Sequence, residues 1–133
     1  MKKKKSIIDT YEAIYNVDLV VANKHVTTEE LRKLYIYSDG AEIEDDNPGD
    51  FATVSTCYRK SDNKSVALVR LHDYKPKYID KFHWIDTISH EAGHVALDIY
   101  GHMDQQVYNS SSEPFCYLLG WVTKCIYKTF QKK

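Results

Sequence analysis

Residues Phe82 to Tyr100 carry the pattern that most constrains how this chain can fold. Apolar residues recur there at the spacing of an α-helix, and Gly101 follows as a typical C-terminal stop. On a helical wheel with about 100° per residue, His90 and His94 fall close together. The opposite side of the wheel is a continuous apolar stripe of Ile88, Ala92, Val95 and Ile99. The sequence therefore predicts a helix that packs on a core and turns a histidine pair toward a cleft.

The segment His90-Glu91-Ala92-Gly93-His94 gives this helix a chemical signature. Residues four apart project from nearly the same line of a helix, so His90 and His94 can bind one Zn²⁺ at about 2.0–2.1 Å. Glu91 lies around the helix from that line, within reach of a water on the metal but poorly placed as a ligand. This is the position of a general base in a zinc hydrolase. The alternative, a solvated polar face that matches the pattern by chance, is disfavoured by the opposed apolar stripe. Gly93 inside the helix suggests the close approach of a neighbouring backbone or ligand.

Composition sets the broad class of the protein. The chain has 133 residues, of which 43% are hydrophobic, so we expect one globular domain over residues 1–133. Its formal net charge of −1 gives no electrostatic reason to expect a nucleic-acid partner. The basic residues 1–5 are expected to form a disordered tail. Asp9 and Glu12 break the apolar stretch that follows, which argues against a signal peptide.

The remaining composition predicts a cytoplasmic protein without a membrane span. No apolar run approaches the roughly 20 residues that a membrane helix requires. The three cysteines are an odd number without a CxxC pair, which favours a reducing compartment and unpaired thiols. We expect these to be small buried residues, namely Cys57, Cys116 and Cys125.

The rest of the chain predicts a single α+β domain, with a small twisted sheet packed on the motif helix and a C-terminal helix. A capping-box pattern at Thr27 to Glu30 starts one further helix, which is expected to run to about Ser38. Two strands joined by Lys60 to Lys64 are expected to form a hairpin, whose second strand is a candidate edge for binding an extended peptide. The other expected elements are a helix at Ser6–Tyr15, strands at Asp18–Ala22, Phe51–Arg59 and Ser65–His72, a polar linker at Tyr74–Lys81, and a helix at Glu113–Lys128 capped by Ser110–Ser112.

A catalytic zinc usually takes three protein ligands and a water, so the histidine pair needs a partner. Glu113 opens the next helix, where capping and helix geometry can fix a carboxylate. His102 and Asp104 follow the motif helix directly and are the alternatives. His83 lies two turns from His90 and is too distant to share the ion.

The arrangement resembles the gluzincin branch of zinc metallopeptidases and, within it, small ImmA/IrrE-type and phage-encoded peptidase domains. The matching segments are Ser89–His94 and Glu113–Tyr117. The resemblance implies a zincin-like fold, a zinc ion held by His90, His94 and Glu113, Glu91 as the general base, and a peptide or protein substrate.

The sequence also departs from related enzymes at defined positions. Metzincins carry a glycine and a third histidine where this chain has Leu97 and Tyr100. Thermolysin-like enzymes carry an aspartate that orients a ligand histidine where this chain has Tyr117. That group must therefore come from elsewhere, and Asp86, one turn before His90, is the candidate.

The function expected from the sequence is hydrolysis of a peptide bond by water that zinc activates and Glu91 deprotonates. Two other functions remain open. One is a metal-binding protein without peptidase activity, and the other is a phage-related interaction module in which the metal braces the fold.

Overall fold

The computed structural model describes residues 4–13, 15–46, 49–73, 82–103, 105–108 and 112–132. Within these residues the fold is a mixed α+β arrangement of a five-stranded sheet and three helices. The elements in chain order are β1 (Ile8–Tyr11), β2 (Asp18–Ala22), α1 (Thr28–Leu34), β3 (Tyr35–Tyr37), β4 (Ala52–Arg59), β5 (Ser65–Leu71), α2 (His83–His102) and α3 (Glu113–Gln131).

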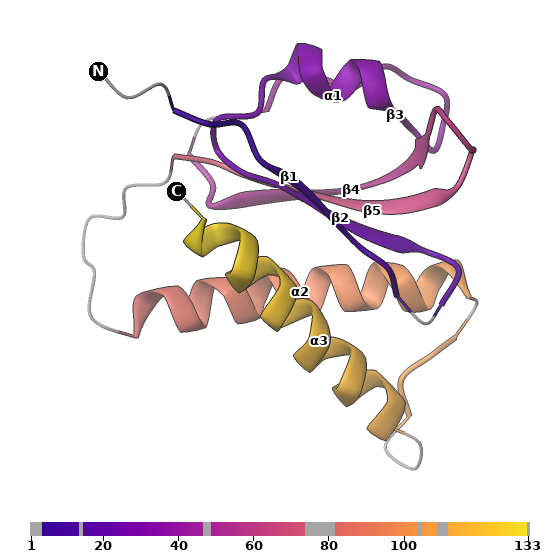
Figure 1. The fold of residues 1–133 in the computed structure, drawn as a ribbon. Coiled ribbons are helices and arrows are strands. Elements are labelled where there is room, and N and C mark those ends of the chain that lie inside the picture. The colour runs from indigo at the N-terminus through magenta and orange to yellow at the C-terminus, as the bar shows by residue number, and fades with distance from the viewer. Residues whose placement is uncertain are drawn as a thin grey trace.

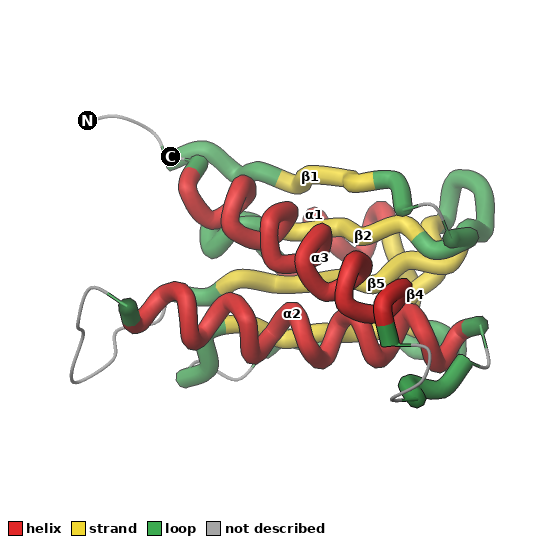
Figure 2. Tube along the Cα trace, turned by 90° about the horizontal axis from the view of Figure 1, so that it is seen from below, coloured by secondary structure: helices red, strands yellow, loops and turns green. Residues whose placement is uncertain are grey.

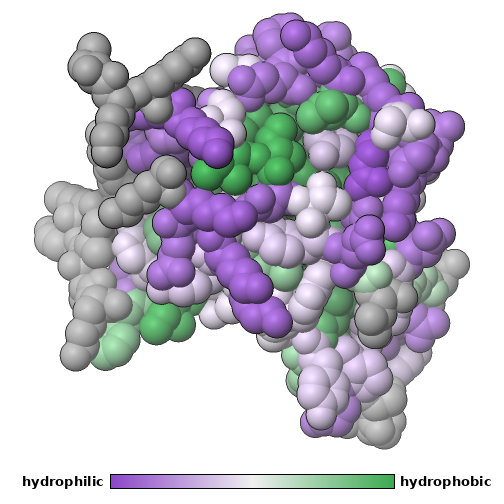
Figure 3. All heavy atoms as spheres, in the orientation of Figure 1, coloured by the Kyte–Doolittle hydropathy of each residue, from purple (hydrophilic) through white to green (hydrophobic). Residues whose placement is uncertain are grey.

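The molecule has three layers. Figure 1 shows α1 on one face of the sheet, while α2 and α3 cover the other face. Seen from the helical side, α2 runs beneath β4 and β5 while α3 crosses β2 and β1 (Figure 2). Figure 3 shows mainly hydrophilic residues on the outer side of α1, where Leu31 is the one buried residue of that short helix. The two-sided cover gives the sheet apolar contacts on both faces.

The strand order is β1-β2-β5-β4-β3, with β2 and β5 parallel and the other neighbours antiparallel. The two central strands have almost no exposed side chains, and Val20, Val21, Leu68 and Val69 are all 0% exposed. Strands covered on both faces are expected to be mainly apolar, and Leu19–Ala22 and Val66–Val69 are. The predicted strand Asp18–Ala22 and the predicted hairpin of β4 and β5 are therefore confirmed.

Helix α2 confirms the predicted amphipathic helix. Its apolar stripe is buried against the sheet and α3, with Val95 and Ile99 at 0% exposure. The helix ends at His102, one residue beyond Gly101, and the N–H of Met103 donates to the carbonyl of Tyr100. Helix α3 begins at Glu113 as predicted and packs beside α2 through Leu118, Val122, Cys125 and Ile126.

The N-terminal prediction was wrong. Ile8–Tyr11 is a strand that pairs antiparallel with β2, not part of a helix spanning Ser6–Tyr15. The apolar spacing fits a helical period, but Ile7, Ile8 and Thr10 are β-branched and fit a pleated surface better. Pairing with β2 supplies hydrogen bonds that a short isolated helix could not match.

Helix α1 starts as predicted but ends early. The N–H of Glu30 donates to Thr27 Oγ1 at 3.2 Å, and the N–H of Thr27 donates to Glu30 Oε2 at 3.3 Å, which confirms the capping box. The helix ends at Leu34 rather than Ser38, because Tyr35–Tyr37 pairs with β4 as strand β3. Tyrosine and isoleucine favour strands, so this segment pairs with β4 instead of continuing the helix.

The predicted edge strand was also wrong. Strand β5 lies between β2 and β4, so Ser65–Leu71 has hydrogen-bonded neighbours on both sides. Its unbroken buried run from Val66 to Leu71 is the signature of an interior strand.

Other predictions fall partly outside the described residues. The linker Tyr74–Lys81, Asp104, the caps Ser110 and Ser111, and tail residues 1–3 all lie there. Ser112 occupies the N-cap of α3 without a side-chain cap hydrogen bond. All three cysteines are free thiols as expected, although Cys116 is exposed rather than buried. No helix among the described residues is long and apolar enough to cross a membrane.

Candidate metal centre and cleft

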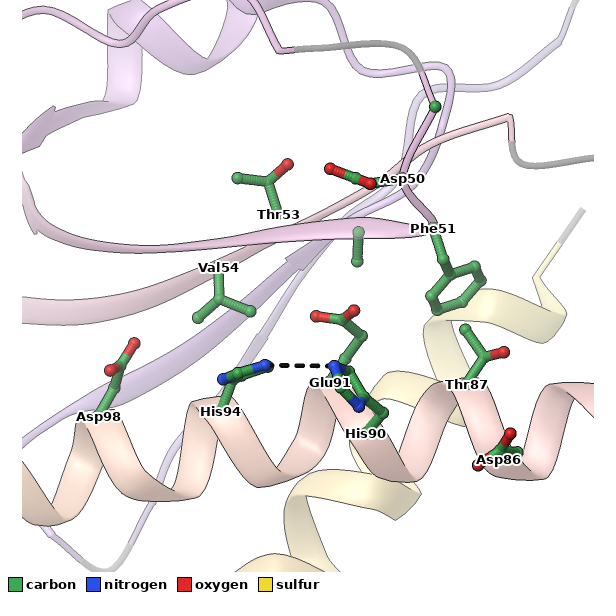
Figure 4. A pocket seen from close by; sticks show the side chains of 12 residues that line it. Asp50, Phe51, Thr53, Val54, Asp86, Thr87, His90, Glu91, His94 and Asp98 are labelled. Atoms are coloured by element: carbon green, nitrogen blue, oxygen red, sulfur yellow. Dashed lines mark hydrogen bonds between the residues drawn. The ribbon is translucent and has the colours of Figure 1, made fainter.

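A cleft of about 710 Å³ separates the first half of β4 from the upper face of α2. Figure 4 shows the histidine pair on the helix side and the strand opposite. The cleft contains the predicted His90, Glu91 and His94 together. Its lining consists of Gly49, Asp50, Phe51, Ala52, Thr53, Val54, Asp86, Thr87, His90, Glu91, His94 and Asp98.

The two histidines lie at the nitrogen separation that one shared metal ion requires. The Nε2 atoms of His90 and His94 are 3.3 Å apart, and the two exposed rings stand at 76° to each other. Two nitrogens bonded at about 2.0–2.1 Å to a tetrahedral Zn²⁺ are separated by about 3.3 Å. In the structure the two nitrogens share a hydrogen bond, and their separation is compatible with one zinc ion between them.

Glu91 projects from α2 toward β4, beside the histidine pair (Figure 4). Its carboxylate is half-buried, and this burial raises the pKa of Glu91 above its ordinary value, while His90 and His94 oppose the rise. A carboxylate with a raised pKa is a stronger proton acceptor than a fully solvated one. Its place next to the two nitrogens is the one predicted for a general base.

The first half of β4 presents an open edge to this cleft. Phe51 accepts from the N–H of His72, and Arg59 donates to Lys64, so odd-numbered residues of β4 bond toward β5. In an antiparallel pair the alternate residues then direct their N–H and C=O groups the other way. On that side β3 reaches only as far as Cys57. The backbone groups of Ala52 and Val54 therefore have no hydrogen-bond partner there among the described residues.

The structure does not place a candidate for the third metal ligand beside the histidine pair. Glu113 is exposed at the first position of α3 and does not line the cleft. His102 is the exposed last residue of α2, and Asp104 lies outside the described residues. Across the part of the chain that the structure describes, no three histidine, cysteine or acidic side chains form a metal-binding group. The role of Glu113 therefore stays a prediction.

Two acidic residues that line the cleft, Asp50 and Asp98, were not predicted from the sequence. Asp50 precedes β4 and contributes to the electrostatic environment of Glu91. Asp98 lies one turn after His94, a spacing of four that repeats the spacing of the histidine pair and that the sequence already displays. Burial raises the pKa of Asp98, and His102 and His94 oppose that rise.

The sequence also made predictions for Gly93 and Asp86, two other residues of α2. A methyl group built on Gly93 would meet no atom within 4 Å, so the predicted close approach of a backbone is wrong. Asp86 lines the cleft but is exposed and points away from β4 (Figure 4). Its proposed contact with His90 stays a prediction.

Comparison with known proteins finds no family model, no curated protein and no solved structure that matches this chain. What the cleft can bind is therefore argued from its own residues. These are a histidine pair at metal-binding separation, an adjacent half-buried carboxylate and an open strand edge.

Proposed function

We propose that this protein is a zinc-dependent hydrolase with a zincin-like fold, and that it cleaves peptide bonds. The observation that carries the proposal is the 3.3 Å separation of the Nε2 atoms of His90 and His94. This separation equals the separation of two nitrogen ligands on a tetrahedral zinc ion, about 3.3 Å. Free cysteines and a reducing cytoplasm are compatible with such a protein.

In this proposal Glu91 moves the proton. When bound, zinc supplies a Lewis acid that polarises a carbonyl group and acidifies water. The carboxylate of Glu91 accepts a proton from the attacking water and later donates it to the leaving amine. Its half-buried position supports this role, because burial strengthens its tendency to hold a proton. His90 and His94 hold the metal, and Glu113 is proposed to complete its ligands.

The substrate in this proposal is an extended peptide that adds to the edge of β4. Backbone groups of Ala52 and Val54 face the open side of the strand within the same cleft. An added strand would satisfy them with main-chain hydrogen bonds, which recognise any extended peptide. The scissile bond would then run past His90 and Glu91. This edge takes the role that the sequence had suggested for β5.

The test separates metal binding from proton transfer. Glu91→Gln is expected to keep zinc and folded structure, and to lower peptide cleavage by roughly 10²–10⁴-fold, since it removes the base alone. His94→Ala is expected to lose both zinc and cleavage. Glu42→Gln, on an exposed side chain away from the cleft, is the matched control and should change neither. Zinc is measured by elemental analysis, and cleavage by mass spectrometry of a defined peptide mixture.

Two results would contradict the proposal. If Glu91→Gln loses zinc as readily as His94→Ala, Glu91 is a ligand and not the base. If the unmodified protein binds one zinc per chain but cleaves no peptide, it is a metal-binding protein in which the ion has a structural role.

A further inference from the structure

Four residues of α2 form one row that extends beyond the histidine pair. Asp86, His90, His94 and Asp98 are spaced by four, so successive members are neighbours along the helix surface, about 6 Å apart along its axis. Each histidine of the pair thus has an aspartate one turn outside it. The pair meets through its Nε2 atoms, which leaves both Nδ1 atoms available to other groups.

The two aspartates differ in direction. Side chains of a helix lean toward its N-terminus, so Asp98 leans toward His94, whereas Asp86 leans away from His90. Figure 4 shows this difference: Asp98 rises from α2 toward the side of β4, whereas Asp86 does not, although both residues line the cleft. Asp98 is half-buried and Asp86 is exposed. Only Asp98 therefore has its carboxylate directed along the row toward a histidine.

The ring of His94 presents its free nitrogen to that side. One nitrogen, Nε2, faces His90, and Figure 4 shows the other ring nitrogen on the side of Asp98. Among the described residues, the charged groups that act on Asp98 are His102 and His94. Within that part of the chain the structure shows no hydrogen bond or ion pair of the Asp98 carboxylate, to His94 or to any other residue, so the carboxylate is unengaged. Asp98 is too far along the helix to share a metal held between His90 and His94, because residues eight apart are separated by about 12 Å of helix rise.

We propose that Asp98 is a positioning residue for His94, and that its unengaged carboxylate turns to accept the Nδ1–H of that ring. This proposal rests on the proposed function, since it concerns a histidine proposed to bind zinc. A hydrogen bond at Nδ1 fixes the tautomer whose Nε2 lone pair is free for the metal and holds the ring at its angle. Asp98 would thereby orient His94 in the way that the sequence had suggested for Asp86 and His90.

The experiment compares zinc affinity across four proteins by competition with a chelator of known affinity. Asp98→Ala is expected to weaken zinc binding by about 10–100-fold, as loss of an orienting carboxylate does at other metal sites. Asp98→Asn retains a neutral acceptor and should fall between Asp98→Ala and the unmodified protein. Glu42→Ala, on an exposed side chain away from the cleft, is the control and should bind zinc like the unmodified protein. Alanine favours a helix, and thermal unfolding verifies that each variant is folded.

A second readout follows the ring itself. In the zinc-free protein, ¹H–¹⁵N spectra of the imidazoles should show His94 protonated at Nδ1, and Asp98→Ala should shift it toward protonation at Nε2. A folded Asp98→Ala protein with unchanged zinc affinity and an unchanged His94 tautomer would overturn the proposal. In that case His94→Ala decides the wider question. If His94→Ala loses zinc while Asp98→Ala keeps it, the metal site is supported and only the role of Asp98 is wrong. If His94→Ala also keeps zinc, the proposed function is wrong as well.

Discussion

Replacing Asp18 by asparagine tests the most buried charge in the described part of the sheet. The side chain of Asp18 is 3% exposed at the start of β2. Its Oδ2 lies 2.6 Å from Arg59 Nη2, and its Oδ1 lies 2.8 Å from Lys64 Nζ. Burial on its own raises the pKa of Asp18, but the contacts with Lys64 and Arg59 outweigh it and hold that pKa below the ordinary value. The ion pairs tie β2 to the hairpin that forms one wall of the cleft.

The magnitude follows from the exposure of the three groups. Removing one member of a fully buried ion pair costs about 3–5 kcal/mol, because the remaining charge stays buried. Arg59 and Lys64 are 20% and 32% exposed, so water can solvate them once Asp18 is neutral. We therefore expect Asp18→Asn to lower the free energy of unfolding by about 2–3 kcal/mol at neutral pH. This is a large share of the roughly 5–15 kcal/mol that stabilises a typical domain.

Urea unfolding at neutral and acid pH measures both the loss and its origin. The pKa of Asp18 is lower in the folded protein than in the unfolded chain. Its stabilisation is therefore complete above the unfolded value of 3.8 and is lost as the pH falls through the folded value. The difference between the unmodified protein and Asp18→Asn should shrink over that acid range.

Asp62→Asn is the matched control for this prediction. Asp62 also contacts Arg59, at 3.0 Å, but its side chain is 49% exposed. An exposed pair contributes little, so this variant should lose less stability than Asp18→Asn. The reasoning fails if the two variants are equally stable at neutral pH, or if the loss in Asp18→Asn does not change on acidification.

Packing gives the remaining predictions. Gly93→Ala should raise the free energy of unfolding by about 0.5–1 kcal/mol, because the added methyl meets no atom within 4 Å inside a helix; a destabilised variant in urea would reveal a contact at that site. Gly40→Ala should lower the melting temperature, because Gly40 has a φ of +89° that alanine adopts only with strain; an unchanged melting temperature would contradict this. Ile99→Ala should cost about 2–5 kcal/mol, because its side chain is 0% exposed between α2 and the sheet; an urea midpoint near that of the unmodified protein would show that the core collapses around the gap.

Features encoded within a few residues were predictable from the sequence. The buried stripe of α2 and the Thr27 capping box depend on neighbouring residues and fixed helical spacing. The strand at Ile8–Tyr11 depends instead on a partner in β2, and the apolar spacing of Ser6–Tyr15 fits a helix as well as a strand. A period alone does not distinguish the two in so short a segment.

The candidate site likewise has one part that the sequence predicts and one part that it does not. His90, Glu91 and His94 come together because one helix turn places them, and Asp98 continues that spacing. The opposing wall of the cleft depends on strand order, which places β4 beside the short strand β3 and leaves the first half of β4 open. Long-range pairing decides which strand lies at an edge, and local patterns indicate this only indirectly. The apolar run of β5 was the signal that pointed to its interior position.

The central claim is that His90 and His94 bind one zinc ion through their Nε2 atoms. A crystal structure of the zinc-loaded protein, with anomalous scattering recorded on both sides of the zinc edge, tests it most directly. We predict one zinc peak per chain, between the two Nε2 atoms at about 2.0–2.1 Å from each, with Glu113 as the third protein ligand. Zinc bound by His90, His94 and His102, with Glu113 in solvent, would refute the choice of Glu113. A peak elsewhere, or no stoichiometric zinc after the metal is added back, would contradict the claim itself.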